Sequence, residues 1–149
     1  MKKYFHECRE TVNMCKREWT SVGSLNNMCA NSLNQACETA IVGLWDIARN
    51  EQFPKEQFIP HHKPISYVKK LEILDYYSDD AKTFLEKLNG SSFDVVRYPE
   101  TQPYKDYTNS KSKGKGSEFI KGTENFIDET EKLTTNNEVL EKIKSFKKS

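Results

Sequence analysis

Apolar residues in the first fifty positions of the chain recur at steps of three and four, which is the spacing of one face of an α-helix. The first stripe contains Phe5, Cys8, Val12, Cys15 and Trp19. Gly23 interrupts the pattern, and the side chain of Ser24 can cap the helix that follows. This arrangement predicts two long helices that form an antiparallel hairpin between Tyr4 and Arg49.

The second helix, expected from about Leu25 to Arg49, is apolar on two sides. One stripe contains Leu25, Cys29, Leu33, Ala36, Ala40, Leu44 and Ile47. The other contains Cys37, Ile41, Trp45 and Ala48. Such a wide apolar surface is typical of a central helix, or of a helix that faces both a core and a partner subunit. We therefore expect the helix to be central and its second side to form a homodimer interface.

Prolines change the pattern after this helix. Three of them fall within residues 54–64, which excludes a regular helix over residues 50–64. Pro64 suits the first turn of a third helix, whose inward positions are Ile65, Val68, Leu71 and Leu74. Ser78 predicts the N-cap of a fourth helix, and Gly90 predicts its end. The residues that this fourth helix would bury are Ala81, Phe84, Leu85 and Leu88.

The last third of the chain begins with a polar stretch, residues 101–116, which is rich in Ser, Lys and Gly and is expected to be mobile. Ser117 then predicts the cap of another helix. Its inward positions are Phe119, Ile120, Phe126, Ile127, Thr130 and Leu133. The pattern predicts an all-α, up-and-down bundle of four or five helices over residues 1–133. Residues 134–149 are expected to form a short amphipathic helix or a frayed tail.

Composition and charge narrow the choice of function. The 149 residues are 36% hydrophobic and 30% charged, and the net charge is +1. These values fit an ordinary globular domain and argue against a strongly basic nucleic-acid binder. No apolar run approaches the roughly 20 residues that span a bilayer, and no apolar signal core follows the N-terminal lysines. We expect a cytoplasmic protein that does not bind a membrane.

The four cysteines fall within the apolar stripes. Cys8 and Cys15 are seven residues apart, and Cys29 and Cys37 are eight apart. This spacing predicts buried, reduced thiols. A zinc site usually contains close pairs such as Cys-x-x-Cys, which the chain lacks. No metal and no cofactor are therefore expected.

Four segments carry a resemblance to a known family. They are SLNQACETAIVGLWDIA (32–48), HHKPISYVKKL (61–71), FDVVRYPE (93–100) and EFIKGTENFIDET (118–130). In this order they resemble the second helix, the His-bearing start of the third helix, the Arg-Tyr-Pro segment and the closing helix of the HEPN family, which includes small prokaryotic helical-bundle domains. The resemblance covers residues 3–133.

The resemblance implies a helical bundle that is commonly a homodimer, and it implies two kinds of function. Many HEPN domains are metal-independent ribonucleases with an Arg-x(4–6)-His motif in the dimer cleft. Others lack the motif and act as the partner of a small nucleotidyltransferase, often as a toxin–antitoxin pair, or as nucleotide binders.

The ribonuclease motif is absent from this chain. Its last histidine is His62, so no histidine follows Arg97, and Arg49 lies twelve residues before His61. We therefore expect a non-catalytic, dimeric HEPN-like interaction module that partners a nucleotidyltransferase or binds nucleotide. The alternative is a divergent ribonuclease that cleaves RNA with Arg97 and His62.

Arg97, Tyr98, His61 and His62 are the candidate ligand- or anion-binding residues. The planar guanidinium group of Arg97 suits phosphate, and the ring of Tyr98 can stack on a base. An imidazole with an ordinary pKa changes its charge near neutral pH, so the pair of histidines can also hold a phosphate. A structural alternative remains for each, because Arg97 can pair with a carboxylate such as Asp46 and the histidines can lie in an exposed loop.

Overall fold

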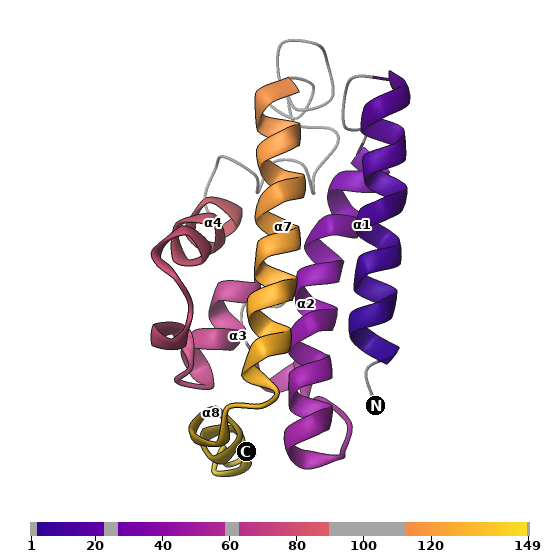
Figure 1. Ribbon diagram of the computed structural model, residues 1–149. Helices are drawn as coiled ribbons and strands as arrows, with labels where there is room; N and C mark the ends of the chain where they lie inside the picture. Colours follow the sequence, from indigo (N-terminus) through magenta and orange to yellow (C-terminus); the bar gives the residue numbers. More distant parts are fainter. Residues whose placement is uncertain (1–2, 23–26, 59–62, 90–112, 149) are drawn as a thin grey trace.

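The computed structural model describes residues 3–22, 27–58, 63–89 and 113–148 (Figure 1). All regular secondary structure in these ranges is helical, which confirms the predicted all-α class. The α-helices are α1 (Lys3–Val22), α2 (Asn27–Arg49), α3 (Pro64–Lys70), α4 (Asp79–Asn89), α7 (Lys113–Leu133) and α8 (Asn137–Lys144). Two short 3-10 helices, η1 (Lys55–Gln57) and η2 (Leu74–Tyr76), lie between α2 and α4.

Helix α2 lies at the centre of the fold. The three long helices α1, α2 and α7 pack against one another along their length (Figure 1). The short helices α3 and α8 also pack on α2, and α4 packs on α3 and α7. The prediction that the second helix is central is therefore confirmed.

Close packing between α1 and α2 depends on small residues. Phe5, which the first stripe placed inward, is buried against Gly43 of α2. A Cβ atom on Gly43 would lie only 2.9 Å from the Cβ atom of Tyr4, so a larger residue there would push the helices apart. The thiol of Cys8 donates to the carbonyl oxygen of Ala36 at 3.2 Å, which joins the two helices.

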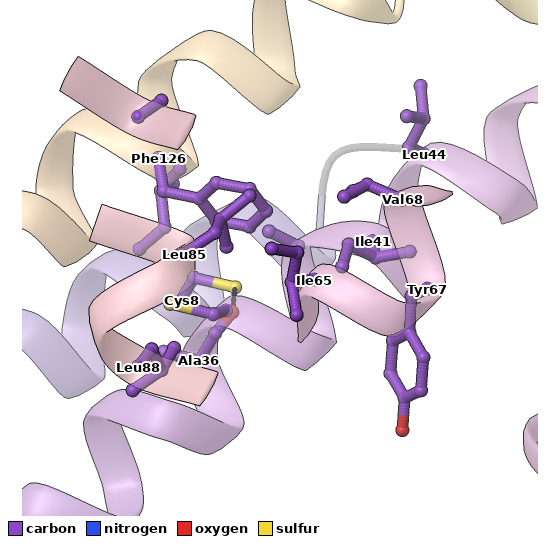
Figure 2. Packing of buried hydrophobic residues seen from close by; sticks show 14 of the residues in the cluster. Cys8, Ala36, Ile41, Leu44, Ile65, Tyr67, Val68, Leu85, Leu88 and Phe126 are labelled. Atoms are coloured by element: carbon purple, nitrogen blue, oxygen red, sulfur yellow. Dashed lines mark hydrogen bonds between the residues drawn. The ribbon is translucent and has the colours of Figure 1, made fainter. Parts of the chain in front are cut away.

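The second apolar side of α2 is covered by the same chain. Cys37, Ile41 and Trp45 are fully buried, and Ala48 is nearly so. Figure 2 shows Ile41 in the same cluster as Ile65 of α3. The prediction that this side forms the homodimer interface is wrong, because α3, α7 and α8 already remove it from solvent.

Helix α3 begins at Pro64, as predicted, but it is shorter than the apolar spacing indicates. The chain leaves the helix after Lys70, and Glu72 has a left-handed backbone conformation with φ of 62°. Because the helical period stops there, Leu74 is only half-buried while Ile73 is fully buried.

Helix α4 begins as the sequence predicts. The hydroxyl oxygen of Ser78 accepts a hydrogen bond from the backbone N–H of Ala81 at 3.2 Å. The carboxylate of Glu129 on α7 accepts from the Ser78 backbone N–H at 2.8 Å and from the Ser78 hydroxyl at 2.6 Å, so the cap also fixes α4 to α7. The predicted inward residues Ala81, Phe84, Leu85 and Leu88 are all buried.

Helix α7 begins one turn earlier than predicted. It starts at Lys113, so Ser117 lies inside the helix and is not its cap. Extending a helix costs less than starting one, which lets the polar, glycine-containing turn join it. The rest of the segment that was predicted to be mobile, residues 101–112, lies outside the described residues.

Helix α8 docks on the bundle, so residues 134–148 continue the fold. The side chain of Asn136 caps the helix by accepting from the N–H of Val139 at 3.2 Å. Val139 and Ile143 are fully buried, and Phe146 is half-buried. This C-terminal piece therefore belongs to the same core as residues 3–133.

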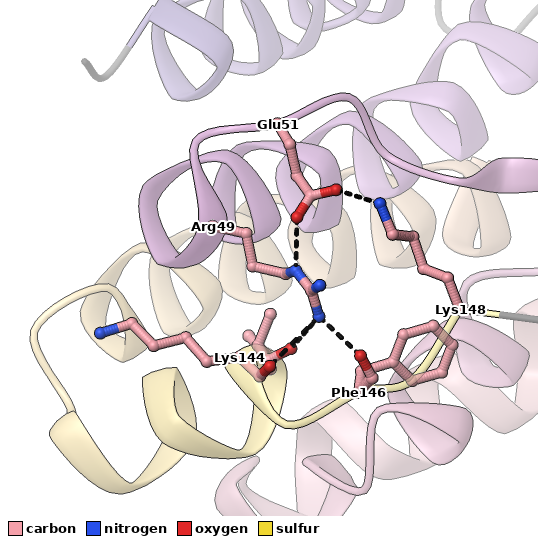
Figure 3. Close-up of polar contacts among 6 residues, drawn as sticks. Arg49, Glu51, Lys144, Phe146 and Lys148 are labelled. Atoms are coloured by element: carbon pink, nitrogen blue, oxygen red, sulfur yellow. Dashed lines mark hydrogen bonds and ion pairs between the residues drawn. The ribbon is translucent and has the colours of Figure 1, made fainter.

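Arg49, the last residue of α2, holds the end of α8 (Figure 3). Its guanidinium group donates to the carbonyl oxygens of Ile143 at 3.0 Å, Lys144 at 3.3 Å and Phe146 at 2.7 Å. The group also lies over the ring of Trp45, 4.6 Å from its centroid. Carbonyl groups at a helix C-terminus lack partners within the helix, so Arg49 supplies the missing donors.

A second interaction supports the position of Arg49. The carboxylate of Glu51 accepts from Nε of Arg49 at 2.8 Å and also pairs with Lys148 (Figure 3). The hydrogen bonds from Lys148 and Arg49 lower the pKa of Glu51. The Glu51 carboxylate therefore stays charged at neutral pH. It links Arg49, at the end of α2, to Lys148, which follows α8.

We expect Arg49→Ala to lower the free energy of unfolding by about 1 to 3 kcal/mol, because several charge-assisted hydrogen bonds are lost. Hydrogen–deuterium exchange should rise over residues 139–146 more than elsewhere. Arg17→Ala, which removes an exposed arginine of α1, serves as the control and should change neither measurement. Unchanged exchange in α8 of the Arg49→Ala variant would contradict this role.

Candidate functional site

The four residues predicted to bind a ligand or anion are His61, His62, Arg97 and Tyr98, and all of them lie outside the described residues. Their grouping into one site therefore stays a prediction. The described residues on either side of the histidines are Phe58 and Lys63.

Phe58 belongs to an aromatic cluster that lies on the C-terminal half of α2. The rings of Phe53 and Phe58 stack with their centroids 4.8 Å apart, and the rings of Phe58 and Phe146 stack with their centroids 5.3 Å apart. Trp45 meets Phe53 edge-on at 5.4 Å, and Tyr67 of α3 meets Phe58 edge-on at 5.3 Å. Phe53 and Phe58 are therefore anchored on α2 and α3.

The hydrophobic pattern of the sequence did not predict this cluster. Phe53 and Phe58 are buried, but their neighbours Pro54 and Pro60 made residues 50–64 look like a loop. The available signal was the pair of phenylalanines itself, since two large apolar side chains in an exposed loop are uncommon.

Two polar residues are buried on α2, and they form the most unusual feature of the helix. Asn34 is 3% exposed and Glu38 is 6% exposed, and they lie one helical turn apart. Trp45 and Arg49 continue the same face toward the end of the helix.

Glu38 lies near a basic residue from the connection after α2. Its Oε2 atom is 3.7 Å from Nζ of Lys55, which belongs to η1. Lys55 reaches this point because Phe53 and Phe58 fix η1 on both sides. A buried carboxylate is costly unless it is paired or hydrogen-bonded, so Lys55 lowers that cost.

Glu38 is not among the predicted site residues, although it lies within the segment that resembles the second HEPN helix. The signal was present, because the carboxylate falls between Cys37 and Ala40 in the apolar stripes. A charged residue in such a stripe is rarely fully buried without a partner.

An open groove of about 720 Å³ lies between the end of α3 and α8. It is lined by Lys70, Leu71, Glu72, Asn137, Glu138, Glu141, Lys142, Ser145 and Phe146. We call it the α3–α8 groove. The hydroxyl of Tyr76 donates to Glu138, and this hydrogen bond raises the pKa of Tyr76 to about 12. Lys70 donates to the carbonyl oxygen of Gln57, so both rims of the groove are held in place.

All four cysteines are buried and reduced, as the sequence predicts. Burial raises the pKa of Cys8 to about 12 and also raises the pKa values of Cys15, Cys29 and Cys37. The thiols therefore stay protonated at neutral pH, which suits packing and disfavours nucleophilic attack. Within the described ranges, no three His, Cys, Asp or Glu side chains are placed to hold a metal ion.

Comparisons with known proteins found no match that indicates a family or a function. No protein-family model, curated protein or solved structure matches the chain. Of the helices that the structure describes, none combines the length and apolar character needed to cross a membrane.

We expect the thiols of the native protein to react with an aromatic disulfide reagent at pH 8 at least about 100-fold more slowly than those of the unfolded chain. Because burial disfavours the Cys8 thiolate, the free energy of unfolding should be unaffected by this group below the ordinary thiol pKa of 9.0 and should fall as the pH rises toward 12. Stopped-flow absorbance measures the rates, and urea unfolding at pH 8 and pH 10 measures the stability. Equal rates in native and unfolded protein would contradict the buried positions.

Proposed function

We propose that the chain is a HEPN-like interaction module that binds a partner protein of the nucleotidyltransferase type through the α3–α8 groove. The observation that carries this proposal is the groove itself, which is open, mixed in charge and built on a firmly held helix. The resemblance of the sequence to the HEPN family supplies the class of partner.

The charges of the groove favour a protein over a nucleotide. Three glutamates, Glu72, Glu138 and Glu141, face two lysines, Lys70 and Lys142. The phosphates of a nucleotide would meet more carboxylates than amines, which disfavours their approach. A protein surface carries both signs of charge and can complement each side chain in turn.

The floor of the groove suits a stable contact. Phe146 is half-buried, and its ring stacks on Phe58 within the aromatic cluster. The guanidinium group of Arg49 donates a hydrogen bond to the carbonyl oxygen of Phe146 and so fixes the backbone there. Because both ring and backbone are already ordered, little conformational entropy remains to be lost when a partner covers them.

The chemistry-bearing side chains described by the structure take part in holding the fold together. Arg49 completes the end of α8, Glu38 lies within α2 beside Lys55, and the four thiols fill the core. These roles support a binding function. A homodimer stays a prediction, and it would require a surface other than the buried second side of α2.

Native affinity purification with the tagged chain tests the partner. We expect the wild-type chain to retain a protein with nucleotidyltransferase motifs, and the groove variant Glu141→Lys/Lys142→Glu to retain at least about tenfold less, since reversed rim charges repel. Glu7→Lys/Arg17→Glu is the matched control, because it exchanges two exposed charges on α1 and also preserves the net charge. Equal recovery with the groove variant would contradict the assigned surface.

A non-catalytic role also predicts that the purified chain leaves RNA intact. Incubation with a labelled single-stranded RNA, followed by gel analysis, provides the measurement. The opposing outcome is cleavage that disappears in both His62→Ala and Arg97→Ala. That result would replace the proposal with the divergent ribonuclease, in which the imidazole transfers protons and the guanidinium stabilises phosphate charge.

A further inference from the structure

The antiparallel hairpin of α1 and α2 brings two of the four thiols together. Cys15 lies in the second half of α1, and Cys29 lies in the first turn of α2. The thiol of Cys15 donates to the carbonyl oxygen of Cys29 at 3.5 Å, and it also forms a hydrogen bond with the Cys29 side chain. These two sulfur-bearing side chains are thus direct neighbours across the helix interface.

The other two cysteines have different partners. The thiol of Cys8 donates to the carbonyl oxygen of Ala36 at 3.2 Å. The side chain of Cys37 forms a hydrogen bond with Thr123 of α7. Their side chains are therefore engaged at separate points of the core, whereas Cys15 and Cys29 interact with each other.

Cys29 is also the most accessible of the four, with 5% of its surface exposed against 0% for Cys15. It is the third residue of α2, where backbone N–H groups have no partner within the helix. Helix ends open locally at much lower cost than helix centres. Opening of this turn alone would expose Cys29 and leave the rest of the core packed.

We propose that Cys15 and Cys29 are a redox-responsive pair that a peroxide oxidises to a disulfide, which then staples α1 to α2. The thiolate of Cys29 attacks one peroxide oxygen, the O–O bond breaks, and a sulfenic acid and water form. The sulfur of Cys15 then displaces the sulfenic hydroxyl, which leaves as a second water with the remaining thiol proton. Two thiols are oxidised by two electrons, and one hydrogen peroxide is reduced to two waters.

The environment of the pair sets the expected behaviour. Protonated, buried thiols react slowly, so oxidation follows opening of the first turn of α2 and is slower than at a free cysteine. The disulfide closes a short loop between the two helices, which restricts the unfolded chain more than the folded one. The staple therefore stabilises the hairpin reversibly, because a dithiol reductant restores both thiols.

Peptide mapping of the full chain tests the proposal. The reduced protein is treated with excess hydrogen peroxide, the remaining thiols are alkylated, and the protein is digested with trypsin without reduction. Cys8 then lies in peptide 4–9, Cys15 in peptide 10–16, and Cys29 and Cys37 together in peptide 18–49. We expect peptides 10–16 and 18–49 to be linked, and the link to disappear on reduction.

Matched variants and fragmentation locate the second sulfur. Cys37→Ser should keep the link, and Cys29→Ser should lose it. Fragmentation of the linked wild-type peptides places the bond at Cys29 or Cys37 without any variant, so the result does not depend on how the variants fold. Oxidation should also raise the thermal midpoint of the wild type and of Cys37→Ser by roughly 5 to 10 °C, with no rise in Cys29→Ser.

Besides a bond that fragmentation places at Cys37, three outcomes would overturn the proposal. The first is a link between peptides 4–9 and 18–49 in place of the expected one, which would assign the chemistry to Cys8. The second is oxidation of Cys15 or Cys29 to sulfinic acid without any link. The third is full recovery of alkylated Cys15 and Cys29 after peroxide treatment that oxidises an unfolded control sample of the same chain.

Discussion

The burial of α2 is the constraint on which the rest of the structure depends. Helices α1 and α7 cover it along its length, and α3 and α8 cover what remains of its apolar surface. A helix in this position needs small residues where neighbours approach, and Gly43 provides that space beneath Tyr4. A buried helix also needs partners for the polar groups that it carries. Lys55 therefore lies near the carboxylate of Glu38, and Arg49 donates hydrogen bonds to carbonyl groups at the end of α8.

Periodicity in the sequence predicted which helix faces are buried, but not what buries them. The stripe from Phe5 to Cys15 and the capped start of α4 at Ser78 were both confirmed, because each depends on interactions within a few residues. The second side of α2 was correctly identified as apolar, yet it was assigned to a partner subunit. Its true covering comes partly from α8, nearly a hundred residues later, and no local pattern connects the two.

The candidate binding surface was harder to predict than the helices. The α3–α8 groove joins Lys70 to Lys142, which are far apart in the chain, so it exists only as a tertiary arrangement. The aromatic cluster beneath the groove was not predicted. The nearby prolines correctly indicated a restricted backbone, but they gave no sign that Phe53 and Phe58 are buried. The two histidines and Arg97 were predicted as site residues from the chemistry of their side chains alone. That chemistry does not show where a residue lies in the fold or which residues surround it.

The contact between Arg49 and α8 has a consequence for how the chain acquires its structure during synthesis. Arg49 and the ring of Trp45 leave the ribosome long before Ile143 and Phe146, which later cover them. Until α8 docks, the aromatic surface around Trp45 lacks this cover, and exposed apolar surface of this kind makes a partly folded chain prone to aggregation. Docking of α8 is therefore the step that covers this aromatic surface.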